Sequence, residues 1–113
     1  DTFVATFLGS PPMNLIPRNG HLLGFRPEHV APRQMLEGAG GDLVPIHYLA
    51  TREEYLGAER LVYGEVEGTK AVARFPSTVD VPAEPGRGYE FAVLARDLKR
   101  FDAATGLRVP GPA

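Results

Sequence analysis

Residues 25–30 read FRPEHV and bring together side chains that take part in acid–base chemistry. Arg26, Glu28 and His29 stand within four positions, and Pro27 stiffens the stretch. Because Pro27 pushes Arg26 out of the helical region, the preceding strand should run into a sharp corner, where Arg26 pairs with Glu28 or with an acid elsewhere. No nucleophile neighbours His29 in the sequence. We therefore interpret Arg26, Glu28 and His29 as a structural joint or contact surface, with catalysis as the alternative.

Paired carboxylates are a second possible source of acid–base chemistry. They occur at Glu53–Glu54 and at Glu65 and Glu67, and the latter two are expected to share one face of a strand. A small domain with 14 acidic residues produces such pairs by chance. We interpret both pairs as solvated surface.

Metal, phosphate and nucleophile motifs are not recognised. The three histidines, His21, His29 and His47, fit neither H-x-H nor H-E-x-x-H spacing, and cysteine is absent. The glycine-rich stretch at 38–41 lacks the Gly-Lys-Ser/Thr that a Walker loop requires, and it leads into a strand. Ser10 lies in a proline turn and not in a G-x-S-x-G elbow. We expect no catalytic residue, no metal and no cofactor in this chain.

Composition points to one ordinary globular domain. The chain has 113 residues, of which 43% are hydrophobic and 23% charged, and its net charge is −2. No apolar run approaches the roughly 18 residues of a membrane span. A nucleic-acid binder normally shows a basic patch, whereas the cations here are scattered, so we expect no nucleic-acid partner.

The elements that must position these residues are mostly short strands, because 13 glycines and 11 prolines break long helices. One short helix is expected from residue 1 or 2 up to Gly9. Strands are expected at 13–16, 21–25, 44–56, 60–68, 70–75 and 89–96, with a closing hairpin at 98–109. Gly64 marks a bulge or a crowded position, and Val79 and Val81 form an edge piece. This pattern predicts a small β-barrel or sandwich.

Four stretches resemble one family in the family's own order. FVATFLGSPPMNLI is similar to the segment where the ATP-binding subunit of maltose-type (carbohydrate) ABC importers leaves its nucleotide-binding domain. GFRPEHV resembles the Gly-Ile-Arg-Pro-Glu-His stretch of that family's C-terminal regulatory domain, the transport-associated OB (TOBE) domain. EYLGAERLVYGEVEG and FDAATGLRV resemble the strand pair and closing hairpin that follow.

The resemblance implies an all-β, OB-like barrel at 13–110, with residues 1–12 as a short helix and linker from an absent ATPase domain and 111–113 as a frayed tail. It implies a regulatory and dimerisation domain that is not itself an enzyme, with ATP and Mg²⁺ held in the absent domain. The implied partners are a second copy of the parent subunit, the permease subunits and a regulatory protein, at the cytoplasmic face of the cell membrane. Candidate interface residues are Pro11, Met13 and Phe101. Since the chain begins with Asp1 and not Met, we expect a fragment or a processed piece.

The chain departs from the family at one place. Between Ile16 and Gly24 it has only the short link PRNGHLL, where the family usually carries a longer stretch, enough for further strands. A gap at this position would leave a barrel edge that needs cover, for instance from a partner subunit.

Four functions remain in competition. The first is the regulatory and dimerisation domain. The second is a sensor of a small ligand, an oxyanion or a sugar, in which backbone N–H groups near Ser10 or the 38–41 loop act together with Arg26. The third, an OB-type nucleic-acid binder, conflicts with the charge, and the fourth, a free-standing enzyme, has no constellation to support it.

Overall fold

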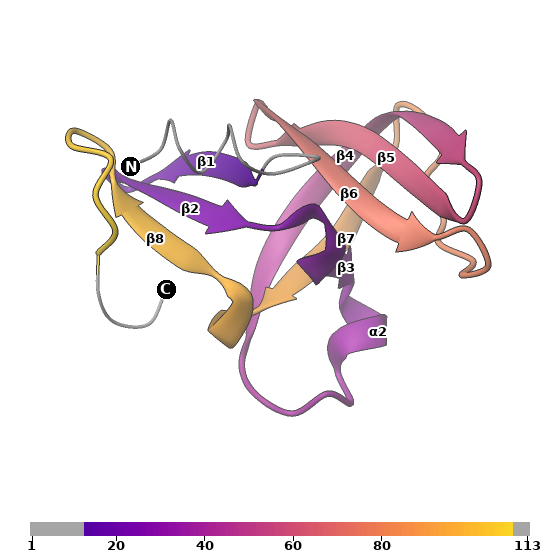
Figure 1. The fold of residues 1–113 in the computed structure, drawn as a ribbon, viewed down its shortest axis with the longest axis horizontal. Helices are drawn as coiled ribbons and strands as arrows, with labels where there is room; N and C mark the ends of the chain where they lie inside the picture. The colour runs from indigo at the N-terminus through magenta and orange to yellow at the C-terminus, as the bar shows by residue number, and fades with distance from the viewer. Residues whose placement is uncertain (1–12, 110–113) are drawn as a thin grey trace.

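The computed structural model describes residues 13–109, which form a small all-β fold of the OB-like kind (Figure 1). Its strands are β1 (Asn14–Arg18), β2 (His21–Phe25), β3 (Val30–Pro32), β4 (Leu43–Leu56), β5 (Glu59–Val66), β6 (Thr69–Pro76), β7 (Gly88–Leu94) and β8 (Lys99–Asp102). The short helices are η1 (Pro27–His29), α2 (Arg33–Leu36) and η2 (Ala95–Asp97). The expected all-β, OB-like class is confirmed. The expected helix and linker at 1–12 and the tail at 111–113 lie outside the described residues.

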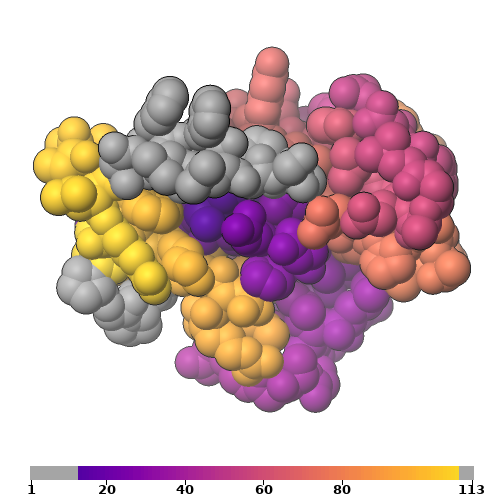
Figure 2. Space-filling model, in the orientation of Figure 1, coloured from indigo at the N-terminus to yellow at the C-terminus, as the bar shows by residue number. Residues whose placement is uncertain are grey.

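The strands form two antiparallel sheets. The smaller sheet has the order β1-β2-β8, and the larger has the order β3-β7-β4-β5-β6. The larger sheet is curled, and the smaller one lies beside it (Figure 1). On the face drawn in Figure 2, the indigo and purple atoms of β1 and β2 lie between the yellow C-terminal hairpin and the β5–β6 hairpin. None of the helices within residues 13–109 has the length and apolar character needed to cross a membrane.

The core lies on the concave side of the larger sheet. Tyr48 and Phe91 stack with ring centroids 5.0 Å apart, and Phe75 meets Phe91 edge-on at 6.2 Å. The hydroxyl of Tyr48 donates to the carbonyl oxygen of Val62 at 2.7 Å. Burial raises the pKa of Tyr48 far above its ordinary value, so the phenol stays protonated. Truncating an aromatic ring in such a core costs roughly 3–5 kcal/mol.

A bend in β4 makes the curl possible. The register of β4 against β5 shifts between Ala50 and Arg52, opposite Gly64. A Cβ atom at Gly64 would lie 2.3 Å from the carbonyl oxygen of Leu49 and 2.5 Å from Cε1 of Tyr48. The expectation that Gly64 marks a bulge or a crowded position is therefore confirmed, since only glycine fits beneath the bent strand.

The short link between β1 and β2 is a tight hairpin turn. Arg18 pairs with His21, which leaves Asn19 and Gly20 as the two loop residues. Both have positive φ, 52° and 80°, as a type I′ turn requires. The turn that we expected from PRNG is present, and it joins the two strands without any gap in their ladder.

The Asn14 side chain joins the edges of the two sheets, and an ion pair between Arg18 of β1 and Glu67 of the β5–β6 turn adds a second link. β1 is an edge of the smaller sheet and β6 an edge of the larger. The Asn14 side-chain amide donates to the carbonyl oxygen of Val72 at 2.8 Å, and its Oδ1 accepts the N–H of Val72, also at 2.8 Å. Asn14 thus bonds to the β6 edge as a neighbouring strand would. At Val72 this edge is covered within the chain, and the expected cover of a barrel edge by a partner subunit stays a prediction.

Two local expectations were wrong. Val79 and Val81 form no strand; Val81 lies in a loop and is 1% exposed. Glu67 belongs to the two-residue β5–β6 turn with a φ of 51°, so it does not share a strand face with Glu65. Between Pro27 and Leu36, where no element was predicted, the structure holds η1, β3 and α2.

Candidate functional site

The FRPEHV stretch forms the corner between β2 and β3. Arg26 has extended backbone angles, φ −73° and ψ 149°, and its carbonyl oxygen accepts the N–H of His29 at 3.0 Å. This agrees with the expected effect of Pro27 on the residue before it. Pro27 itself is buried and begins the 3-10 turn η1.

The ion pairs at this corner differ from the expected ones. Arg74 of β6 binds the Glu28 carboxylate at 3.2 Å, and its Nε lies 3.2 Å from Oε2 of Glu59. Within residues 13–109, Glu28 therefore pairs with Arg74 and not with Arg26, and Arg26 is exposed without an ion pair. These side chains are partly solvated, so the link between η1 and β6 contributes up to about 1 kcal/mol.

His29 lies half-buried beside this link. Its Nδ1 is buried and has no hydrogen-bond partner within the described residues. Arg26 and Glu28 lie on the surface. The arrangement is compatible with a joint that also presents a contact surface, and both roles stay predictions.

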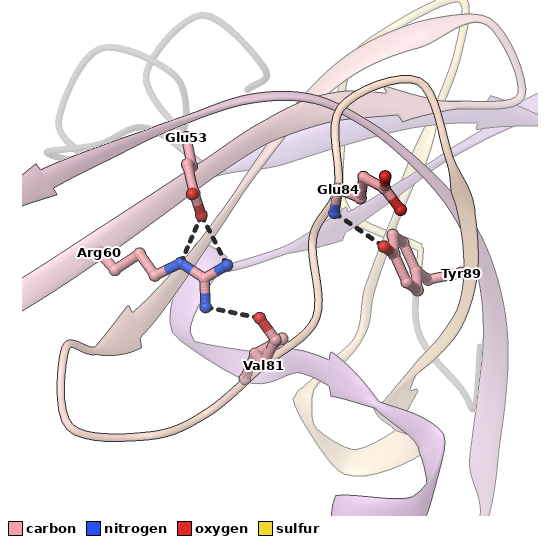
Figure 3. Close-up of polar contacts among 5 residues, drawn as sticks. All are labelled: Glu53, Arg60, Val81, Glu84 and Tyr89. Atoms are coloured by element: carbon pink, nitrogen blue, oxygen red, sulfur yellow. Dashed lines mark hydrogen bonds and ion pairs between the residues drawn. The ribbon is translucent and has the colours of Figure 1, made fainter.

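A buried arginine holds the loop at 77–87, which sequence reasoning did not single out. Arg60 is 7% exposed, and two of its nitrogens lie 2.8 and 2.6 Å from one carboxylate oxygen of Glu53 (Figure 3). Its Nη1 donates to the carbonyl oxygen of Val81 at 2.6 Å (Figure 3). A buried guanidinium needs such partners, because removing it from water is costly. Arg60 thus ties the loop to the start of β5.

Tyr89 anchors the far end of the same loop. Its hydroxyl oxygen accepts the N–H of Glu84 at 2.7 Å (Figure 3). Gly86 N–H donates to the carbonyl oxygen of Ala50 at 2.8 Å, which adds a main-chain attachment to β4. Ala83 is 7% exposed and packs into the core. The loop is therefore a fixed wall of the barrel.

A cleft of about 460 Å³ opens beside this wall, between the loop, β7 and α2. Its apolar lining is Pro32, Pro82, Tyr89 and Phe91, and its polar lining is Arg33, Gln34, Glu37 and Glu90. Arg33 donates to Glu90 at 2.8 Å and lies 3.7 Å from Glu37. The hydrogen bond to Glu90 raises the pKa of Arg33 above its ordinary value. A pocket with apolar walls and a few polar groups is the usual form of a ligand site.

Of the predicted interface residues, Met13 and Phe101 are described, and Pro11 lies outside the described range. A Cβ atom at Gly24 would lie 2.7 Å from Sδ of Met13 and 2.8 Å from Cε2 of Phe101. Both side chains therefore pack over β2, and Phe101 is only 8% exposed. Their part in a subunit interface stays a prediction.

The predicted anion-binding loop at 38–41 is engaged within the chain. Nη1 of Arg96 donates to the carbonyl oxygen of Gly40 at 3.0 Å. Ser10, the other predicted contributor, lies outside the described residues. Within residues 13–109, no three His, Cys, Asp or Glu side chains gather where they could hold a metal ion.

Comparison with known proteins identifies relatives over nearly the whole chain. The sn-glycerol-3-phosphate import ATP-binding protein UgpC of Cupriavidus metallidurans is 32% identical over 148 residues, which cover 99% of this chain and 38% of the relative. The UgpC protein of Ruegeria pomeroyi is 33% identical over 132 residues, covering 96% of this chain and 35% of the relative. That of Cereibacter sphaeroides is 32% identical over 130 residues, with coverages of 96% and 35%. No family model matches.

The chain is therefore homologous to part of an import ATP-binding subunit, and it spans somewhat over a third of the length of these relatives. The resemblance seen in the sequence is confirmed at this level. The alignment with the Cupriavidus protein has 148 positions against 113 residues here, so at least 35 positions face gaps in this chain. The resemblance places such a shortening between Ile16 and Gly24, where the structure has the two-residue turn.

Proposed function

We propose that this chain is the C-terminal regulatory and dimerisation domain, of the TOBE type, of the ATP-binding subunit of an ABC importer for sugars or related polyols. The observation that carries the proposal is the homology, which runs over nearly the whole chain to proteins named as import ATP-binding proteins. The OB-like fold supports it. In this proposal the chain is not an enzyme, and ATP and Mg²⁺ bind in a preceding domain of the parent subunit.

In the proposed mechanism the domain catalyses no reaction; it couples the association of subunits and the binding of a regulator to transport. The proposed partners are a second parent subunit, the permease subunits and a regulatory protein, at the cytoplasmic face of the cell membrane. A rigid barrel fused to a motor domain can hold two copies together while the motors open and close. A regulator acts on this equilibrium only through its different affinity for the two states. The ties from Arg60 and Tyr89 to the 77–87 loop give the barrel a surface of fixed shape for such contacts.

The genome of the source organism provides the first test. The reading frame upstream of Asp1 should encode a Walker motif and an ABC signature. A stop codon directly upstream, or an unrelated domain, would contradict the proposal.

The second test is association. Sedimentation velocity of the full parent subunit with ATP should show a dimer, and the 113-residue chain should not hydrolyse ATP. A parent subunit that stays strictly monomeric under transport conditions counts against the proposal. Turnover of ATP by the short chain, lost in His29→Ala or Glu28→Gln, would restore the catalytic alternative for FRPEHV.

A second candidate function is the sensing of a small ligand, an oxyanion or a sugar. The observation that favours it is the cleft beside β7, which combines apolar walls with four polar side chains. Calorimetric titration of the chain with molybdate, sulfate and sugars tests it, and absence of heat with all of them removes it.

A further inference from the structure

The net charge of the side chains lining the cleft beside β7 favours some classes of ligand over others. Its lining carries two carboxylates, Glu37 and Glu90, against one guanidinium, Arg33. Arg33 is already paired with both. The local balance is therefore negative, which disfavours phosphates and other oxyanions. Neutral ligands with many hydroxyl groups face no such penalty.

The polar groups of the cleft retain unused hydrogen-bonding capacity. The hydroxyl oxygen of Tyr89 accepts the N–H of Glu84, which leaves its proton to donate to a ligand. Glu90 engages Arg33 through Oε1 and keeps Oε2 as an acceptor. The amide of Gln34 belongs to the lining of the cleft and lies at an exposed position, where it can donate and accept. Donors and acceptors thus alternate around one space, as a hydroxyl-rich ligand requires.

The apolar walls complement this pattern. Tyr89 presents aromatic surface, and Pro32 and Pro82 present pyrrolidine rings. Phe91 is 1% exposed and supports this wall from the core. The C–H face of a sugar ring can pack against such surfaces while its hydroxyls reach the polar rim. The volume of about 460 Å³ lies in the range of small-ligand pockets, roughly 300–1,000 Å³.

We propose that the cleft formed by β7, α2 and the 77–87 loop binds a neutral polyol of monosaccharide size. In this arrangement Glu90 accepts ligand hydroxyls, Gln34 and Tyr89 donate to them, and the Tyr89 ring with the two prolines packs against the ligand ring. The proposal gives a chemical class to the sensing alternative above. Its link to transport rests on the proposed function, but binding itself does not.

A second pocket provides the internal comparison. It has a volume of about 380 Å³, and its lining includes Arg18, His21 and Arg100 but no carboxylate. An oxyanion would favour that pocket over the cleft. The position of the response therefore separates a polyol from a phosphate.

The test is a titration of the 113-residue chain, followed by two-dimensional ¹H–¹⁵N NMR. Glucose, maltose and glycerol are the polyol probes, and inorganic phosphate and glycerol 3-phosphate are the anionic probes. At least one polyol should shift the amide signals of Gln34, Tyr89 and Glu90 along saturable curves. The anionic probes should leave these three signals less affected than that polyol does.

Two variants assign the response to the cleft. Glu90→Gln and Gln34→Ala should each weaken polyol binding by about fivefold, because each removes a hydrogen-bonding group. Glu65→Gln, on β5 outside the cleft, should bind as the parent chain does. Thermal unfolding of each variant verifies that the fold persists.

Three results would overturn the proposal: no saturable shift with any polyol, equal or stronger response of the cleft signals to phosphate, or unchanged binding in both cleft variants. Because the titration needs neither ATP nor association, its failure is distinguishable from failure of the proposed function. A monomeric parent subunit that still binds glucose in the cleft would remove the transport role and keep the site.

Discussion

Asn14 and Val72 exchange two hydrogen bonds of 2.8 Å each, and this exchange joins the edge of one sheet to the edge of the other. The two residues stand 58 positions apart in the sequence. Asn14 is 5% exposed, so water does not replace the bonds when they are lost. At this position the Asn14 side chain makes the two hydrogen bonds that the backbone of a neighbouring strand would otherwise make.

Asn14→Ala should lower the free energy of unfolding by roughly 2–4 kcal/mol, because it leaves the N–H and C=O of Val72 buried without partners. Urea denaturation measures this. Gln34→Ala, at an exposed position, serves as the control and should change stability by less than about 0.5 kcal/mol. An Asn14→Ala chain as stable as this control would show that the two sheets hold together without the amide.

Arg60→Met should cost roughly 2–4 kcal/mol, since it leaves Glu53 and the carbonyl of Val81 without their cation. The loop at 77–87 should then be cut faster by proteases. Denaturation and limited proteolysis check the two effects.

Arg87→Met is the matched control for that change, because Arg87 and Glu84 are each 68% exposed. It should alter stability by less than about 0.5 kcal/mol. Equal effects of the two arginine changes would contradict the anchoring role of Arg60.

Gly64→Ala should destabilise the chain by about 3 kcal/mol or more, or prevent folding, because the added Cβ would overlap backbone and ring atoms of β4. Gly38→Ala is the matched control, since nothing lies within 4 Å of its added Cβ and its φ is not positive. Circular dichroism during thermal unfolding compares the two. A well-folded Gly64→Ala chain would mean that the bend in β4 moves freely.

Asp102 should make the closing loop sensitive to acid. Hydrogen bonds from the N–H groups of Thr105 and Ala104 lower the pKa of Asp102 below its ordinary value of 3.8. When the pKa of a carboxyl group is lower in the folded state than in the unfolded state, the group stabilises the fold at pH values above its unfolded-state pKa. This stability is lost as the pH falls through the folded-state pKa. NMR titration should find Asp102 among the most acidic aspartates, and Asp102→Asn should reduce the acid sensitivity of the loop. An unshifted Asp102 would contradict the loop bonds.

Local patterns in the sequence predicted the strands well, because a strand with one buried face shows alternating apolar and polar residues within its own sequence. Leu43–Leu56 alternates clearly, Gly88–Leu94 is rich in strand-forming residues but buried at every position from Phe91 on, and the Asp102–Gly106 loop carries its own turn residues. The effect of Pro27 on Arg26 was predicted, but the short elements that follow were not: Pro27 starts η1 and Pro32 ends an edge strand. The turn at Glu67 was missed because glutamate rarely takes a positive φ.

The polar contacts that organise the candidate site could not be predicted from the sequence. Arg60 meets Val81 across 21 positions and Arg74 meets Glu28 across the barrel, and no local period encodes either pairing. The joint role of Glu28 stays a prediction, and its ion-pair partner is Arg74, whereas the sequence suggested Arg26 as one possible partner. The cleft is formed by three elements that are separate in the sequence, so no single stretch of sequence predicts it.

The two-residue turn at Asn19–Gly20 is a position where the fold can accept an insertion. Both flanking strands keep their alignment through β8 and through Asn14, so whatever emerges from this tip does not disturb the ladder. A longer segment from a relative could be inserted at this turn, while the two sheets keep their structure. Under the proposed function, gain or loss of such segments would let the same fold take part in importers that are regulated in different ways.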